Sequence, residues 1–407
     1  MSRWELGPIL RAMTRNKVGA ILIALQIAVT MTIIVNAAYI IVERHTMMQR
    51  DSGLDEQNSF YLTTTGFGAD FEPKRVITED LDLIRRTPGV VDAIQINAIP
   101  ISGGGWSMSL TTETGDDADD VNTANYMTDE HGSNALDFNI IAGSDFVASD
   151  VRWRERNQTD WPDKALVTKA LAESLFPESP WQESVGKTVY IAEDEPVIIT
   201  GIIDKLQAPW IGWSNLEHAM ITPEYLVSES TRYFIRTEPA QRDRLMAELE
   251  STLADKYPNR IIRDVTTLTD TRERSYRQHS AMITILTTVM FLLTLVTAVG
   301  IVGLTSFNVN RRKKQIGTRR ALGATQGAII RYFMLENLLI SAGGLLLGVV
   351  LTIALNMALI EWFSITALDW FYIPIGVVVL WVVGQLAVLG PALRASRVPP
   401  AIATRTV

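Results

Sequence analysis

The sequence of 407 residues contains no cysteine, only four histidines and no recognisable catalytic motif. Without cysteine there is no disulfide framework and no thiol chemistry, and a chain of this length has enough core to fold without disulfides. The histidines are scattered, and no two of them have the spacing of metal ligands. No phosphate-binding loop, H-E-x-x-H motif or Ser/His/Asp set is present. Nothing in the residues therefore supports catalysis.

Charge is absent from four long runs. No Asp, Glu, Lys or Arg occurs in Val18–Val42, Ser280–Asn310, Asn337–Ile360 or Trp370–Leu393. Each run is long enough to cross a bilayer, which takes roughly 20 apolar residues. The first run is too long for the apolar region of a secretory signal and has no cleavage-site pattern where it ends, so we expect an uncleaved anchor. The runs predict four transmembrane helices.

The distribution of the charges predicts the orientation of these helices. Residues 43–280 carry 41 Asp and Glu against 23 Lys and Arg, whereas the rest of the chain carries 4 against 14. The basic residues lie before the first run, between the second and third, and after the fourth. Because Lys and Arg accumulate in cytoplasmic connections, both termini are predicted in the cytoplasm and residues 44–275 outside it. This also explains the basic stretch "RRKKQIGTRRALGAT" (311–325) without a nucleic-acid partner, which we do not expect.

The acidic block is predicted to be an α+β domain, with two subdomains, because helical and strand patterns alternate along it. Strand patterns occur in "ALVTK" (165–169) and "PVIITGIID" (196–204), and helical patterns in "ALAESLF" (170–176) and "QRDRLMAELESTLADKY" (241–257). No helix breaker separates Asp270 from the second run, so one helix is expected to continue unbroken into the membrane. The fold class is therefore an α-helical membrane protein with a large extracytoplasmic α+β domain inserted between transmembrane helices 1 and 2.

The predicted domains follow from these patterns. Residues 1–43 hold a short amphipathic helix, with a disordered basic flank as the alternative, and transmembrane helix 1. The extracytoplasmic domain occupies 44–275 and transmembrane helix 2 occupies 276–310. A cytoplasmic basic segment follows at 311–334, and the last two transmembrane helices with a cytoplasmic tail at 335–407.

Four residues inside the runs are predicted to serve helix packing. Gln26 and Asn36 carry amides, which need hydrogen-bond partners in hydrocarbon and should face other helices rather than lipid. A role for them in substrate binding is the alternative. Gly344 and Gly348 form a G-x-x-x-G pair, a spacing that lets two helix backbones approach closely.

At the basic segment the sequence resembles a known family, the MacB/FtsX-type permease subunits of ABC transport systems. These have one span, a large outside domain and three further spans, with an R-R-x-x-I-G-x-x-R-A-L-G-A core after the second span. The matching residues here are Arg311, Arg312, Ile316, Gly317, Arg320, Ala321, Leu322, Gly323 and Ala324. The ending "GPALRASRVPPAIATR" and the outside segment "SVGKTVYI" are also similar to the family. Gln315 stands where the family usually has Glu, and the first span is more polar than in many homodimeric members, which favours pairing with a different permease.

The resemblance implies a non-catalytic permease subunit of the bacterial inner membrane. It would hold no cofactor, and ATP and Mg²⁺ would be bound by a separate ABC ATPase subunit. The other implied partners are membrane lipid, a second permease (the same or a different homologue), a periplasmic adaptor and an outer-membrane channel. The expected function is export, driven by movement that the ATPase imposes. An FtsX-like regulator of an envelope hydrolase and a lipoprotein-extraction permease are the alternatives.

In such a permease the connection between spans two and three contacts the ATPase. We expect Arg319 and Arg320 to meet acidic groups and Leu322 to fill an apolar pocket. Gly317 and Gly323 bracket "TRRAL", which predicts only a short turn of helix between them. The residues of this candidate coupling site are Gly317, Thr318, Arg319, Arg320, Ala321, Leu322, Gly323, Ala324 and Thr325.

Overall fold

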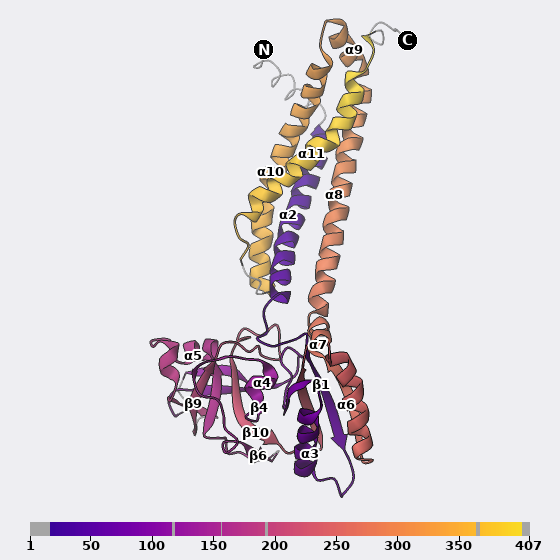
Figure 1. Ribbon diagram of the computed structural model, residues 1–407. Coiled ribbons are helices and arrows are strands. Elements are labelled where there is room, and N and C mark those ends of the chain that lie inside the picture. Colours follow the sequence, from indigo (N-terminus) through magenta and orange to yellow (C-terminus); the bar gives the residue numbers. More distant parts are fainter. Residues whose placement is uncertain (1–16, 116–118, 156, 192–193, 364–366, 401–407) are drawn as a thin grey trace. The chain divides into compact units, whose positions relative to one another are not determined.

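The computed structural model describes residues 17–115, 119–155, 157–191, 194–363 and 367–400 (Figure 1). It divides into two compact units, one formed by Met1–Gln49 with His279–Val407 and the other by Arg50–Gln278. The amphipathic helix predicted within residues 2–17 lies, except for Lys17, outside the described residues. The predicted fold class, four long apolar helices with an α+β domain between the first and the second, is confirmed.

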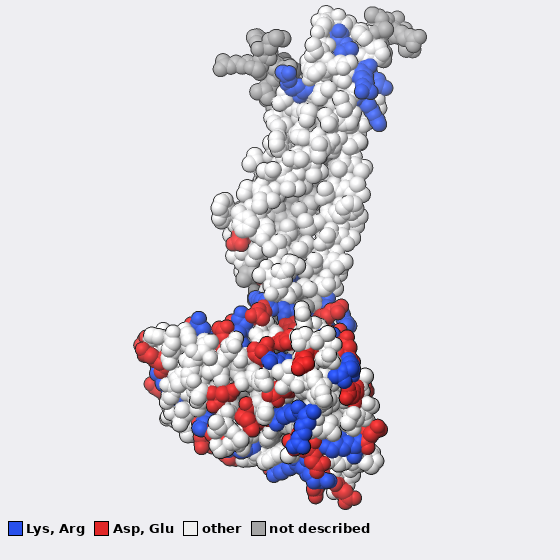
Figure 2. Space-filling model, in the orientation of Figure 1, with Lys and Arg blue, Asp and Glu red and all other residues white. Residues whose placement is uncertain are grey.

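Four helices of the first unit are long and apolar enough to cross a membrane: α2 (Lys17–Met48), α8 (Arg277–Arg311), α10 (Gln326–Phe363) and α11 (Tyr372–Ser396). The chain is thus a multi-pass membrane protein. A short helix, α9 (Lys313–Ala321), joins α8 to α10. Figure 2 shows the surface of these helices almost free of charged residues along their length, with Lys and Arg gathered at the end that carries α9.

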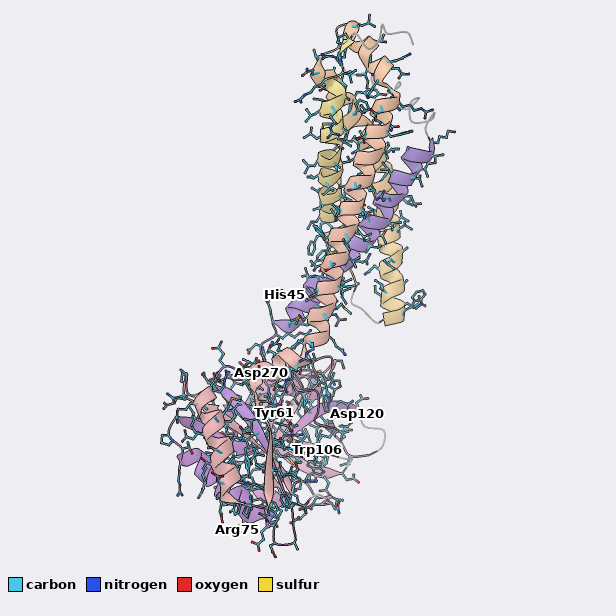
Figure 3. All side chains as sticks on the ribbon, turned by 90° about the vertical axis from the view of Figure 1, so that its right-hand side faces the viewer. His45, Tyr61, Arg75, Trp106, Asp120 and Asp270 are labelled. Atoms are coloured by element: carbon cyan, nitrogen blue, oxygen red, sulfur yellow. The ribbon has the colours of Figure 1, made fainter. Side chains whose placement is uncertain are left out.

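The helices of this unit bury unequal shares of their surfaces. α2, α10 and α11 share a core that includes Ile27, Met31, Leu345 and Val388. α8 has three buried residues, Thr297, Ile301 and Val309. Figure 3 shows α8 along the front of the bundle with α2 crossing behind it. α8 therefore leaves most of its apolar surface to lipid or to another protein.

The second unit contains a four-stranded antiparallel sheet in the order β12 (Arg260–Thr267), β1 (Ser59–Gly66), β11 (Ser230–Thr237) and β2 (Val90–Gln95). Side chains of a strand alternate between its two faces. Tyr233 and Ile235 accordingly pack with Leu81 of α3 (Pro73–Arg86) and Leu249 of α6 (Arg242–Lys256), whereas Phe234 belongs to a different core. The two helices cover one face of this sheet, and its other face meets the rest of the unit.

The larger sheet is mixed, in the order β4 (Asp120–Thr128), β3 (Trp106–Thr111), β8 (Thr188–Ile191), β9 (Glu195–Ile203), β7 (Lys164–Thr168), β10 (Ala219–Leu226) and β6 (Arg152–Arg154). β5 (Ile140–Gly143) pairs with β9, and β4 also pairs with β10, so six strands close on themselves. Two short helices, α4 (Gly132–Leu136) and α5 (Lys169–Leu175), and a 3₁₀ turn (Trp181–Ser184) complete the unit. The strands and helices predicted from residues 165–204 lie within two residues of their observed positions.

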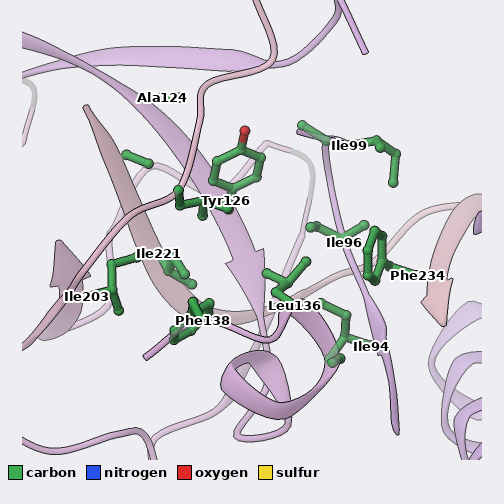
Figure 4. Packing of buried hydrophobic residues seen from close by; sticks show 14 of the residues in the cluster. Ile94, Ile96, Ile99, Ala124, Tyr126, Leu136, Phe138, Ile203, Ile221 and Phe234 are labelled. Atoms are coloured by element: carbon green, nitrogen blue, oxygen red, sulfur yellow. The ribbon is translucent and has the colours of Figure 1, made fainter. Parts of the chain in front are cut away.

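The two sheets share one core. Figure 4 shows Phe234 and Ile94 of the smaller sheet among Tyr126, Ile221 and Leu136 of the larger part. A buried polar cluster also crosses this boundary. The fully buried Asp129 accepts hydrogen bonds from Arg85 of α3 and, at 2.5 Å, from the hydroxyl of Tyr225, and burial raises the pKa of Tyr225. The predicted subdomains are therefore two sheets of one packed body.

The expected unbroken helix into the second span is interrupted at one residue. α7 (Leu268–Ser275) ends before Tyr276, and α8 begins after it. Tyr276 has φ −90° and ψ 5°, a bridge conformation outside the α-helical region, and its side chain is 2% exposed. The guanidinium of Arg272 lies over the ring of Tyr276, 5.4 Å from its centre, as a cation over an aromatic face. The prediction of one continuous helix was therefore wrong. The break could not be foreseen, because no glycine or proline occurs near Tyr276 in the sequence.

Candidate functional site

The predicted coupling site lies on α9 and the turn that follows it. α9 has nine residues and is separated from α8 by Arg312, whose φ of −103° and ψ of 12° interrupt the helix. Gly317 lies inside α9 and is buried next to Ile316, so the predicted start of a helical turn at Gly317 was wrong. Ile316 belongs to the core of the membrane helices, and Gly317 is buried beside it.

The predicted end of this helix at Gly323 is correct. Gly323 has φ +94°, a conformation that favours glycine. Its N–H donates to the carbonyl of Arg320 at 3.1 Å, and the N–H of Ala324 donates to that of Arg319 at 3.0 Å. This pair of bonds is the Schellman motif that closes helix C-termini. The side-chain oxygen of Thr325 then accepts from the N–H of Ala328 at 3.2 Å and caps α10.

The outward face of this segment is formed by Thr318, Ala321 and Leu322, which are exposed. Leu322 is 83% exposed, the largest value among the large apolar residues that the structure describes. A leucine in that position contributes almost nothing to the core of its own chain. It is therefore available to a partner.

An ion pair that was not predicted from the sequence fixes the base of α9. One guanidinium nitrogen of Arg312 lies 3.0 and 2.9 Å from the two carboxylate oxygens of Glu336 on α10. Glu336 is buried, and it is the only acidic residue between Arg274 and Ile360. A single carboxylate among so many basic residues, at the edge of an apolar run, was the signal that could have pointed to it.

The two arginines expected to meet acidic groups have different surroundings. The guanidinium of Arg319 lies over the ring of Tyr332 on α10, 4.8 Å from its centre, while the residue as a whole stays exposed. Arg320 is partly exposed, and its Nε has no hydrogen-bond partner among the described residues. Arg319 thus helps to hold α9 on α10, and Arg320 keeps its hydrogen-bonding capacity.

The structure places Gly344 and Gly348 of α10 directly against α2. A methyl group added at Gly344 would lie 2.6 Å from the carbonyl oxygen of Ala24, and one at Gly348 would lie 3.0 Å from Met31. Gly343 differs from both, because a methyl group there would meet nothing within 4 Å. The G-x-x-x-G spacing therefore coincides with a close approach of α2 and α10.

Replacing Gly344 by alanine is expected to force α2 and α10 apart. Overpacking of this kind costs about 1–3 kcal/mol, because the clashing atoms belong to the α2 backbone and cannot rotate away. Gly343→Ala is the matched control, with the same added methyl group on the open side of the same helix. The measurement is the midpoint of thermal unfolding in detergent. Equal midpoints for the two variants would contradict the packing assignment.

The two amides of α2 have different neighbours. The amide nitrogen of Asn36 donates to the carbonyl of Thr32 at 2.8 Å and to that of Thr352 on α10 at 3.4 Å. Gln26 is partly exposed and faces α8, where a side chain at Gly300 would collide with it. No hydrogen bond to Gln26 occurs within the described residues. Asn36 thus serves contacts inside the bundle, whereas Gln26 lines a groove between α2 and α8 together with the hydrogen-bonded pair Thr30 and Thr297.

A known protein family matches the half of the membrane unit that contains α9. The model of the FtsX-like permease C-terminal family matches residues 287–400, from within α8 to just beyond α11. Residues 287–400 are an FtsX-like permease domain. This FtsX-like domain contains every residue of the candidate coupling site. It also contains the Arg312–Glu336 pair and the Gly344/Gly348 pair.

The curated relatives include a fused ATP-binding/permease protein and an ABC transporter permease. The macrolide export ATP-binding/permease protein MacB of Shewanella sp. (strain ANA-3) is 24% identical over 212 residues, which are 49% of this chain and 31% of that protein. The uncharacterized ABC transporter permease YknZ of Bacillus subtilis is 22% identical over 247 residues, 59% of this chain and 61% of YknZ. The alignments thus span less than two thirds of each relative. The crystal structure of the periplasmic region of MacB from Actinobacillus actinomycetemcomitans matches with a TM-score of 0.35 and 12% identity, covering 57% of this chain and 98% of that one.

Proposed function

We propose that this chain is the membrane subunit of an ABC-type export complex and passes ATP-driven movement from a separate ATPase subunit to its own extracytoplasmic domain. The observation that supports this most directly is the exposed Leu322 at the end of α9, within an FtsX-like permease domain. A helix that presents an apolar residue to solvent, while its base is held by a buried ion pair, is suited to being gripped by another protein.

Movement of α9 would reach the other helices through its own contacts. Ile316 packs into the core shared by α2, α10 and α11, and Arg312 holds Glu336 of α10. α10 packs closely on α2 at Gly344 and Gly348. The chain leaves the membrane unit after α2 and re-enters it at α8, so these two helices would carry the displacement outward. Such a switch needs two packings of similar energy, one of which the ATPase favours when it binds nucleotide.

ATP and Mg²⁺ belong to the partner in this proposal. The sequence has no phosphate-binding loop, and hydrolysis of ATP depends on groups that cradle and polarise the phosphates. Stimulation of a co-expressed ATPase encoded beside this chain is the experiment that tests the proposed function. An ATPase that neither co-purifies with the chain nor changes its rate in its presence would contradict it.

The groove between α2 and α8 supports the presence of a second permease. It has a volume of about 390 Å³ and is apolar except for Gln26, Thr30 and Thr297. An amide that faces hydrocarbon needs a hydrogen-bond partner, and α8 leaves most of its surface uncovered. We place a second permease, the same or a homologous one, against this face. If the complex exports a substrate, its further partners would be a periplasmic adaptor and an outer-membrane channel. Co-purification of an envelope hydrolase would instead favour a regulatory role, and co-purification of a lipoprotein chaperone would favour lipoprotein extraction.

The proposed topology has α9 and both termini in the cytoplasm and residues 44–275 in the periplasm. A cysteine at the exposed Thr114 is expected to react with an impermeant thiol reagent added to intact spheroplasts, and one at the exposed Gln326 only after lysis. The chain has no native cysteine, so each variant carries a single label site. Labelling of both positions, or of Gln326 alone, before lysis would contradict this orientation.

A further inference from the structure

A second groove of the membrane unit lies between α10 and α11. It has a volume of about 540 Å³ and an almost wholly apolar lining. Residues one helical turn apart on α10 form one wall, from Gly327 through Met334 to Leu338, and Trp381 and Leu386 of α11 belong to the other. The distance from Gly327 to Leu338 along α10 is about 16 Å at 1.5 Å per residue, so the groove is elongated along the helices.

One end of this groove carries a positive charge. Arg331 lines it, five residues after the start of α10, and is exposed. No carboxylate lies within ion-pairing distance of Arg331 in the part of the chain that the structure describes, and Glu336 on the same helix is paired with Arg312. An arginine beside apolar helix surface is stable when an anion accompanies it.

A polar group inside the lining also lacks a partner. The side-chain nitrogen of Gln385 is buried, and it has no hydrogen bond to any described residue. A buried N–H without an acceptor costs about 1–3 kcal/mol unless something bound nearby accepts from it. Carbonyl or phosphate oxygens of an occupant of the groove would do so.

We propose that this groove is a binding site for an anionic phospholipid. The phosphate group is held by Arg331, an ester oxygen accepts from Gln385, and an acyl chain lies along the apolar walls toward Leu338. The basic end of α10 is the cytoplasmic one in the topology proposed above, so the lipid comes from the inner leaflet. Basic pockets between transmembrane helices on that side are known to hold anionic headgroups. A second protein copy fits less well, because the exposed cation would then need an acidic residue from the partner.

Trp381 allows the site to be tested by fluorescence. The purified full chain is reconstituted with brominated phosphatidylglycerol or brominated phosphatidylcholine, which quench tryptophan on contact, and the Trp381 signal is obtained as the difference from Trp381→Phe. Phosphatidylglycerol is expected to occupy the groove about fivefold more tightly than phosphatidylcholine, the effect of one basic residue at the membrane surface. Arg331→Gln is expected to reduce this ratio to about one, and Arg331→Lys to retain most of it.

Two further variants distinguish lipid binding in this groove from general electrostatic attraction of anionic lipid to basic residues of the protein. Arg394→Gln removes an exposed charge near the end of α11 that does not line the groove, and it is expected to leave the ratio unchanged. Gly327→Phe places a ring at the groove mouth, where an added Cβ would meet nothing within 4 Å, and it is expected to abolish quenching by both lipids. Equal quenching by both lipids in the wild type, or an equal loss in Arg394→Gln, overturns the proposal. The proposal is also overturned if neither lipid quenches Trp381, since that result would mean that another protein covers the groove. The test needs no ATPase, so its outcome does not depend on coupling.

Discussion

Leu322→Asp is expected to abolish stimulation of the partner ATPase while the chain still inserts and folds. The side chain is 83% exposed, so the change removes no packing within this chain. At the proposed interface it places a charge without a partner in an apolar pocket, which costs on the order of 3–5 kcal/mol. That corresponds to a loss of affinity of roughly a hundredfold or more. The measurements are co-purification of the ATPase and its rate with and without the permease.

The control for Leu322→Asp is Gln326→Asp, which adds the same charge four residues further on. Gln326 is the first residue of α10 and is exposed, and an acidic group is favourable at a helix N-terminus. This variant is expected to couple at nearly the wild-type level. If Leu322→Asp also binds and stimulates the ATPase normally, the basic stretch is only a determinant of topology.

Arg312→Ala is expected to uncouple the ATPase as well, for a different reason. The change leaves the carboxylate of Glu336 buried without its cation, which typically costs about 3–5 kcal/mol. The base of α9 then loses its fixed attachment to α10, so movement of α9 is no longer passed on. The expected result is a lower thermal midpoint together with loss of stimulation.

A double variant distinguishes this ion pair from a surface contact. Arg312→Met with Glu336→Met replaces the pair by apolar groups and removes the unpaired charge, so the thermal midpoint is expected to recover to near the wild-type value. Coupling is expected to recover in part, because Ile316 still packs in the membrane core. A double variant as unstable as Arg312→Ala would show that the two side chains do not act as a pair. Lys313→Ala, at an exposed neighbouring position, is the control and is expected to change neither measurement.

The sequence was most informative where a pattern arises from the solvent. The charge-free runs predicted the four apolar helices because burial of charge in hydrocarbon is costly at every position of a span. The strands and helix of residues 165–204 were also predictable, since alternation of apolar side chains follows from the geometry of a strand. Gly323 was found as a helix end because few other residues adopt its backbone conformation.

The sequence was least informative where a residue's role depends on a neighbour from another element. Gly317 has the same local preference as Gly323, yet it continues α9 because the helix packs there against the membrane core. The break at Tyr276 has no local signal either, and it comes where the ring is buried in the unit formed by Arg50–Gln278.

Patterns along the sequence were enough to predict four membrane spans, an α+β domain between the first and second spans, and a basic connection between the second and third. Each of these follows from local composition, since solvation acts on each residue separately. Which groups meet is set by the packing of the helices: Arg312 with Glu336, Arg319 with Tyr332, and Gly344 with the backbone of α2. These contacts join residues from different helices, and pairings of that kind depend on how the helices cross rather than on the sequence around either partner.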